Sequence, residues 1–105
     1  DEQIVSEEGI KLMTKKYYNG FPDPSEPNAF PLEGYVYGFT FSVLEDSEAW
    51  GSGAPSGIYG WSGYHNTWYW IDPTNNLYAL FMSNSIEPDF SILKNFQLAT
   101  YNFIK

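Results

Sequence analysis

Few side chains in this sequence could perform acid–base or nucleophilic chemistry. The chain has a single histidine, His65, and neither cysteine nor arginine, which excludes a thiolate nucleophile and a metal site built from several histidines or cysteines. Carboxylates are neighbours at Glu7 and Glu8, and again between Glu45 and Glu48. General acid–base catalysis needs carboxyl groups that face each other in a cleft, whereas adjacent acids at a helix start or in a turn are typical of solvated surface. We therefore expect no metal, no cofactor and no catalytic carboxylate pair.

The most specific pattern lies in residues 57–73, Gly-Ile-Tyr-Gly-Trp-Ser-Gly-Tyr-His-Asn-Thr-Trp-Tyr-Trp-Ile-Asp-Pro. This segment resembles the third active-site motif and following hairpin of the serine β-lactamase, penicillin-binding protein and esterase superfamily. There a strand carries Lys-Thr-Gly, or in relatives His-Thr-Gly or Trp-Gly-Gly, followed by a Gly-Thr and an Ile-Asp-Pro turn. Residues 10–13, 34–39 and 77–84 and the last helix resemble the flanking elements of the esterase-like members. The resemblance thus spans nearly all of the chain.

The resemblance implies roles for five consecutive residues. The motif strand edges the active-site cleft, so Trp61, Ser62, Gly63 and His65 would contact substrate, and Gly63 would let the backbone approach closely. The backbone N–H of Tyr64 would supply half of an oxyanion hole. Trp61 replaces a lysine or histidine, which removes a cation that would pair with a substrate carboxylate. Four of them also have a purely structural interpretation: Trp61 as a buried sheet tryptophan, Ser62 as a polar strand residue, Gly63 as a bulge or kink and His65 as a polar strand-end residue.

The superfamily's nucleophile is the serine of Ser-x-x-Lys, and its second motif is Tyr-x-Asn or Ser-x-Asn. Both precede the third motif by long stretches of chain. Here Ser91 to Lys94 and residues 17–19, Tyr-Tyr-Asn, match these patterns, but Ser91 and Lys94 follow the third motif, and an asparagine beside a glycine is typical of a helix end. We interpret both matches as coincidental and expect the catalytic serine to lie outside this sequence.

Hydrophobic periodicity, together with residues that end helices and strands, predicts the elements that must position the motif. Ser6 as a cap and apolar residues at helical spacing predict a helix over 7–17, and four prolines predict a connector over 21–32. From residue 35 the period becomes two, which predicts one long strand to residue 44. Its expected faces hold alternate residues, with Tyr35, Tyr37, Phe39, Phe41 and Val43 on one of them. An acidic turn is expected at 45–48.

Three more strands are predicted at 58–63, 67–71 and 77–82, the last two joined by an Asp-Pro-Thr-Asn-Asn reversal typical of an antiparallel hairpin. A final helix over 89–104 should cover one sheet face with a stripe of Ile92, Phe96, Ala99 and Phe103. Tyr69 and Ile71 alternate with Trp68 and Trp70, so both faces are apolar. The second face lacks an obvious cover, which indicates a missing partner or missing chain.

Composition excludes several classes of partner. Thirteen acidic residues against five lysines give a net charge of −8, so no basic surface exists for nucleic acid or an anionic membrane. The sequence holds no apolar run near the ~20 residues of a membrane-spanning helix, and no basic leader precedes an apolar segment at its amino end. Apolar and aromatic residues are abundant enough to form a dense core. We expect a soluble, ordered domain.

Together these patterns predict an α+β fold: an antiparallel sheet of about four strands, a C-terminal helix on one face and a short N-terminal helix. Residues 1–105 would be a single unit, the C-terminal part of a β-lactamase-like hydrolase that acts on esters, amides or β-lactams. This chain alone should be inactive, and its partner would be the rest of the hydrolase or a second copy. The resemblance favours a periplasmic or secreted location. The alternative is a non-catalytic β module that binds carbohydrate or protein, with Trp50, Trp68 and Trp70 as a stacking platform.

Overall fold

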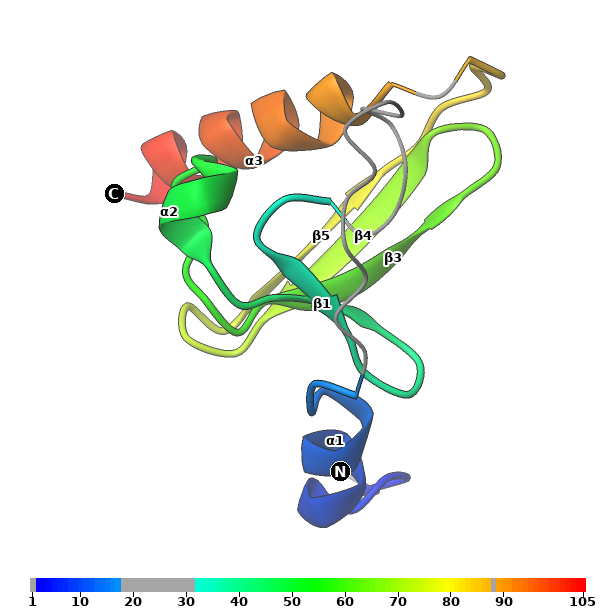
Figure 1. The fold of residues 1–105 in the computed structure, drawn as a ribbon, viewed down its shortest axis with the longest axis vertical. Helices are drawn as coiled ribbons and strands as arrows, with labels where there is room; N and C mark the ends of the chain where they lie inside the picture. The colour runs from blue at the N-terminus through cyan, green and yellow to red at the C-terminus, as the bar shows by residue number, and fades with distance from the viewer. Residues whose placement is uncertain (1, 18–31, 88) are drawn as a thin grey trace.

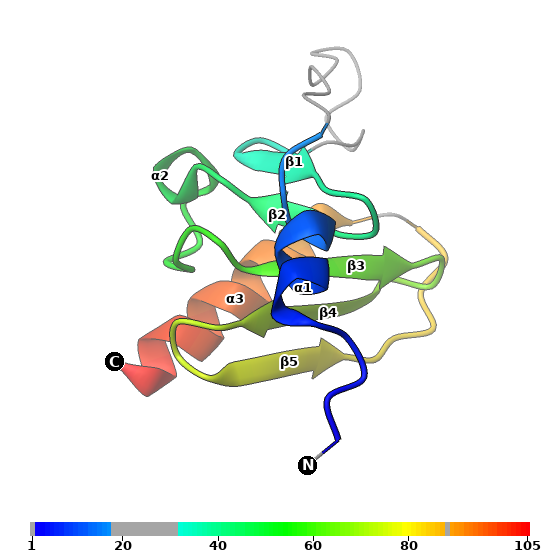
Figure 2. The same cartoon turned by 90° about the horizontal axis from the view of Figure 1, so that it is seen from below.

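The computed structural model describes residues 2–17, 32–87 and 89–105. The elements, in chain order, are α1 (Glu7–Met13), β1 (Tyr35–Tyr37), β2 (Ser42–Leu44), α2 (Ser47–Trp50), β3 (Tyr59–Gly63), β4 (Thr67–Asp72), β5 (Leu77–Phe81) and α3 (Phe90–Ile104). The strands form one antiparallel sheet in the order β1-β2-β3-β4-β5. Helix α3 lies along one face of the sheet and α1 lies on the other side (Figures 1 and 2). The predicted α+β class is confirmed.

The prediction of one long strand over 35–44 was wrong. Two strands, β1 and β2, lie there instead, so the sheet has five strands. The Gly38 N–H donates to the Phe41 carbonyl at 2.8 Å, which reverses the chain between β1 and β2. The carbonyl of Met13 lies so close that a Cβ on Gly38 would collide with it, and this carbonyl accepts the N–H of Phe39 at 3.2 Å. Aromatic residues continue to alternate through the turn, so the sequence pattern could not reveal it.

The turn also changes which side chains share a face. Tyr35 pairs with Leu44 and lies in the core under α3, whereas Val36 pairs with Val43 in a second cluster on the opposite face. Tyr35 and Val43 were expected on the same face of one strand. They lie on opposite faces because the four-residue reversal reorients β2 relative to β1.

Helix α1 begins as predicted and ends four residues early. The Ser6 hydroxyl accepts the N–H of Gly9 at 3.0 Å and caps the helix. The helix stops at Met13 rather than at residue 17, because the N–H of Tyr17 donates to the Tyr37 carbonyl at 2.8 Å and no longer points back into the helix. The chain after α1 is thereby fastened to β1.

Two stretches predicted to be irregular have different outcomes. The proline-rich connector lies outside the described residues except for Leu32, which is buried in the main core. The acidic stretch contains the short helix α2 instead of a plain turn, because the Asp46 carboxylate accepts the Ala49 N–H at 3.0 Å. Gly51 ends this helix in the left-handed conformation at φ 66°.

The three later strands are confirmed to within one residue at each end. Strands β4 and β5 form the predicted hairpin, with Trp70 opposite Ala79. The reversal is built by Asp72, whose Oδ1 accepts the N–H groups of Thr74 at 2.9 Å and Asn75 at 3.0 Å. A side chain that bonds backbone N–H groups two and three residues ahead is the local reason for a turn here.

Helix α3 covers the sheet, but not with the predicted stripe. Its buried side chains are Leu93, Gln97 and Tyr101, at intervals of four residues, while Phe103 is 88% exposed. Phe90 and Phe96 pack at the margins, with ring centroids 5.4 Å from Trp68 and 5.2 Å from Trp70. The predicted stripe was wrong because it included apolar residues only and left out Gln97 and Tyr101, which carry polar groups.

Those polar residues are buried because hydrogen bonds satisfy them. Gln97 accepts the indole N–H of Trp50 at 2.7 Å and donates to the Tyr35 hydroxyl at 3.1 Å. The Tyr101 hydroxyl accepts the indole N–H of Trp70 at 3.1 Å and donates to the Asp72 carboxylate at 2.9 Å. Burial, followed by the bond to Asp72, raises the pKa of Tyr101 above its usual value. The network fixes the position of α3 on the sheet.

The buried tyrosines should lower the free energy of unfolding at alkaline pH. Burial raises the pKa of Tyr35 to about 12, so the folded state favours the neutral phenol relative to the unfolded chain, in which tyrosine ionises near pH ~10. Folding stability should be constant below pH ~10 and decline above it by about 1.4 kcal/mol per pH unit for each such tyrosine, until pH ~12. Denaturant unfolding from pH 9 to 12 measures this. Tyr35→Phe should flatten the decline, and ionisation of all nine tyrosines near pH ~10 without unfolding would contradict it.

The sheet face opposite α3 has a smaller core and an exposed apolar region. Val36, Val43 and Tyr59 are buried there, with Phe41 and Ile71 packed against them. Farther along β3, β4 and β5, the cross-strand row of Trp61, Tyr69 and Leu80 is exposed. Helix α1 buries none of its own side chains. Within the described ranges this end of the second face is therefore open to solvent.

Candidate functional site

The predicted motif occupies the end of β3 and the turn after it. Trp61 pairs with Tyr69, and both lie on the face opposite α3. Trp61 is 37% exposed, whereas the other three tryptophans are at most 7% exposed. Its ring centroid lies 5.4 Å from that of Tyr37, at 59°. The interpretation of Trp61 as a buried sheet tryptophan is therefore wrong, since it is a surface residue held against a second ring.

Ser62 and Gly63 occupy regular ladder positions. Ser62 pairs with Trp68, whose side chain lies under α3, so the Ser62 side chain faces away from Trp61. Gly63 pairs with Thr67, and the register continues through it without a bulge. A Cβ on Gly63 would collide with the Thr67 hydroxyl, so the cross-strand partner requires glycine here, and Gly63 itself is exposed.

Tyr64 and His65 lie in the turn that joins β3 to β4. Tyr64 is 80% exposed, and its ring meets the His65 imidazole edge-on at 5.2 Å and 87°. Both are therefore surface residues at the end of the strand that carries Trp61 and Gly63. The structure places the five predicted site residues along one exposed strand end, with the ring of Tyr37 added from β1.

Sequence reasoning missed three residues, of which Tyr37 and Asn66 lie near this strand end and Asp72 lies at the opposite end of β4. Tyr37 was treated only as a strand residue, although its ring contacts Trp61, and burial raises the pKa of its phenol to about 12. Asn66 and Asp72 were treated as parts of a motif and a turn, and both side chains are buried. The available signal for Asn66 was an asparagine at a hairpin reversal, where the left-handed conformation is common.

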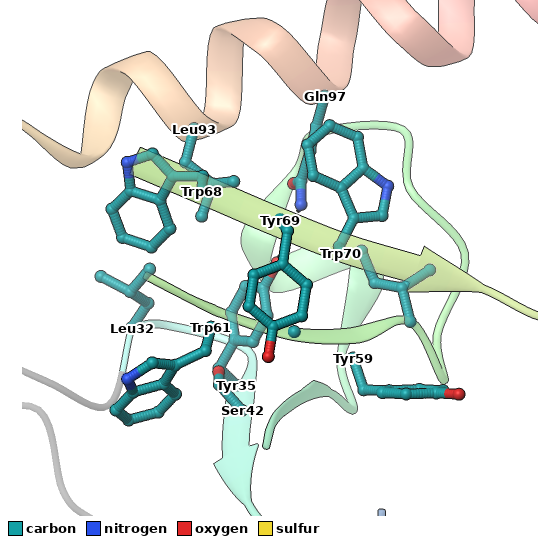
Figure 3. A pocket seen from close by; sticks show the side chains of 12 residues that line it. Leu32, Tyr35, Ser42, Tyr59, Trp61, Trp68, Tyr69, Trp70, Leu93 and Gln97 are labelled. Carbon is teal, nitrogen blue, oxygen red and sulfur yellow. Dashed lines mark hydrogen bonds between the residues drawn. The ribbon is translucent and has the colours of Figure 1, made fainter. Parts of the chain in front are cut away.

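The small pocket nearest the motif lies between β4 and its neighbours. In Figure 3, Leu93 and Gln97 reach from α3 toward Trp68 and Trp70, while Trp61 lies on the far side of β4 from the helix. The walls are almost entirely apolar. This pocket is part of the core beneath the motif, and its lining holds no carboxylate, histidine or lysine.

The lysines of the chain lie outside the motif. The five lysines belong to α1, the segment after it, α3 and the C-cap of α3. Lys16 forms a 2.6 Å ion pair with Glu45, Lys15 lies 5.9 Å from the ring of Tyr17, and Lys94 lies 5.3 Å from the Trp50 ring. Strand β3 itself carries no charged residue, and its exposed end is aromatic.

The two coincidental motif matches have other roles. The hydroxyl of Ser91 donates to the Asp89 carboxylate at the start of α3, and the Lys94 ammonium lies over the Trp50 ring. Of residues 17–19 only Tyr17 is described, and its ring stacks on Phe39 at 3.8 Å. The second match, Tyr18 and Asn19, lies outside the described residues.

The carboxylates and tryptophans offer no further site. Glu7, Glu8, Glu45 and Glu48 are exposed, as expected for solvated acids. No cluster of three or more His, Cys, Asp or Glu side chains that could hold a metal ion lies among residues 2–17, 32–87 and 89–105. The platform proposed from Trp50, Trp68 and Trp70 was wrong, because all three belong to the core under α3.

A strand that ends in an exposed aromatic motif, within an antiparallel sheet covered on one face by a helix, defines an α+β unit whose second face is partly exposed in the described residues. The family model described as Beta-lactamase matches residues 1–101. The chain therefore belongs to the Beta-lactamase family, which supports a serine hydrolase-like origin. No curated protein matches the sequence. In the described part of the chain, no helix combines the length and apolar character needed to cross a bilayer.

Proposed function

We propose that this chain supplies the cleft-edge strand of a serine hydrolase whose nucleophile lies on another segment or chain. The observation that carries the proposal is the placement of Trp61: it is exposed on the uncovered sheet face, next to Gly63 and the exposed turn at Tyr64. Family membership supports the hydrolase chemistry. Residues 1–105 would form one unit of that enzyme, in a periplasmic or secreted location.

The reaction would be acyl transfer through a serine ester. The serine oxygen attacks the carbonyl carbon of an ester or amide, the alcohol or amine leaves with a proton, and water later hydrolyses the acyl-enzyme. The Tyr64 N–H would donate to the carbonyl oxygen as negative charge develops on it, together with the N–H of the nucleophile itself. The exposure of Gly63 and Tyr64 at the strand end supports this role.

The charge distribution favours uncharged substrates. No lysine lies on β3 or β4, so nothing on this strand pair would neutralise a carboxylate on the substrate. Trp61 and Tyr37 present rings instead. We therefore favour neutral esters or amides over β-lactams, which carry a carboxylate.

The test begins with the chain alone, incubated with an activated ester and with a chromogenic β-lactam. We expect no burst and no mass increase; an adduct at Ser91 would overturn the assignment of the nucleophile to another segment. The chain is then joined to or mixed with a family segment that carries Ser-x-x-Lys, and ester hydrolysis should appear. In that assembly Trp61→Lys should raise the relative kcat/KM for carboxylate-bearing esters by about tenfold, consistent with one charge-assisted contact. Absence of hydrolysis in a folded assembly would refute the proposed function.

A second candidate function rests on the open face itself. Tyr69, Leu80 and Trp61 form an exposed row across three strands, and such a surface could bind a carbohydrate or a protein without catalysis. Quenching of tryptophan fluorescence by a glycan panel, in a chain that sediments as a monomer, would favour this alternative. Trp61 is the exposed reporter, because the other three indoles are buried.

A further inference from the structure

Two asparagines in this fold adopt the left-handed conformation, and their side chains have different surroundings. Asn66, at φ 55°, ends the turn between β3 and β4, and Asn76, at φ 51°, ends the turn between β4 and β5. Asn76 is exposed, as is usual for a turn asparagine, whereas Asn66 is only 4% exposed. Backbone conformation alone explains Asn76. The burial of Asn66 requires a reason beyond the turn.

The side-chain amide of Asn66 forms hydrogen bonds with the backbone of Ser85, Glu87 and Asp89. Its Nδ2 donates to the carbonyl of Glu87 and, at 3.4 Å, to that of Ser85. Its Oδ1 accepts the N–H of Asp89 at 3.2 Å. Two donors and one acceptor are the main hydrogen-bonding capacity of an asparagine amide. The side chain therefore fastens the β3–β4 turn to the segment that leads into α3.

Through Asp89, this connection reaches helix α3. Asp89 caps α3, since its Oδ1 accepts the N–H of Ser91 at 2.9 Å. Helix α3 is in turn fixed to the sheet by the hydrogen bonds of Gln97 and Tyr101. The turn is thus positioned by the covering helix as well as by its own two strands.

We propose that Asn66 is a positioning residue that holds the Tyr64 N–H in place for the oxyanion. This inference rests on the proposed function, because it assigns to Asn66 the role of holding the turn that carries the proposed oxyanion donor. A donor aids catalysis only when it is already aimed at the position where charge develops. Tyr64 lies two residues from Asn66 in an exposed hairpin tip, and such tips move freely unless side chains restrain them.

The first measurement uses the 105-residue chain and amide hydrogen exchange. Asn66→Gly keeps the left-handed backbone and removes the side-chain bonds, and Asn66→Asp keeps the shape but replaces the amide donor by a carboxylate that carbonyls repel. Both should speed exchange at residues 64–67, 85–87 and 89 by about tenfold or more, with residues 77–81 unchanged. Asn76→Gly is the matched control and should leave residues 64–67 unchanged. Unaltered exchange at residues 64–67 in both Asn66 variants would overturn the proposal.

The second measurement uses the assembled hydrolase. Asn66→Gly should lower kcat by roughly 10²-fold with little change in KM, the pattern for loss of an interaction made in the transition state; Asn76→Gly should match the wild type. If the wild-type assembly hydrolyses esters and Asn66→Gly keeps full kcat, the positioning role is wrong and the proposed function stands. If the wild-type assembly is folded and inactive, the proposed function fails and takes the catalytic role of Asn66 with it.

Discussion

Replacing Asp72 with alanine should destabilise the fold by about 3 kcal/mol or more. The carboxylate is fully buried and accepts four hydrogen bonds, from two backbone N–H groups of its turn, from the Asn75 amide and from the Tyr101 hydroxyl. Alanine would leave the buried Tyr101 hydroxyl without its acceptor and would remove the bonds that shape the turn at Thr74 and Asn75. Denaturant unfolding followed by tryptophan fluorescence measures the loss.

Two further variants make this prediction specific. Asp72→Asn keeps the shape and should lose about half as much, since one oxygen still accepts. Asp46→Ala removes an exposed aspartate that caps α2 through one N–H at 3.0 Å and should cost about 1 kcal/mol. Equal losses in Asp72→Ala and Asp46→Ala would show that the buried network does not hold α3.

Gly60→Ala should have an effect of similar size through the backbone. Gly60 pairs with Trp70 in the centre of the sheet, and a Cβ there would collide with the Tyr69 carbonyl and lie 2.8 Å from the Trp70 Cα. Neither backbone atom can rotate away, so β3 and β4 would have to separate. We expect a loss of about 3 kcal/mol or more and insoluble protein at high expression.

Gly57→Ala separates this collision from ordinary glycine effects. Gly57 has φ 95°, which disfavours alanine, but nothing lies within 4 Å of the added Cβ. That variant should lose about 1 kcal/mol. A Gly60→Ala protein with wild-type stability and circular dichroism would mean that β3 and β4 pair less closely than described.

The sequence predicted the class of fold and most of its strands. The runs in β3, β4 and β5 could be recognised because turn residues bound them and because Asp72 initiates a reversal through its own side chain. The hairpin at 38–41 could not be recognised, because it depends on a backbone contact between Gly38 and Met13, 25 positions earlier in the chain. Alternation within a segment carries no information on such a contact.

The choice of buried residues was harder to predict than the elements themselves. Gln97 and Tyr101 are buried because Trp50, Tyr35 and Asp72 supply their partners, and those partners lie 29 to 62 positions away in the chain. The same difficulty affected the site. Trp61 and Trp68 cannot be distinguished by residue type, and only the side of the sheet that α3 covers decides which of them is exposed.

The order of the elements along the chain has a consequence for biosynthesis. Trp68 and Trp70 face α3, which follows all five strands. A ribosome therefore completes the sheet before it has made the helix that shields it. During that interval the indoles are available to chaperones and to neighbouring nascent chains, so yield in the cell should depend on translation speed through the terminal helix.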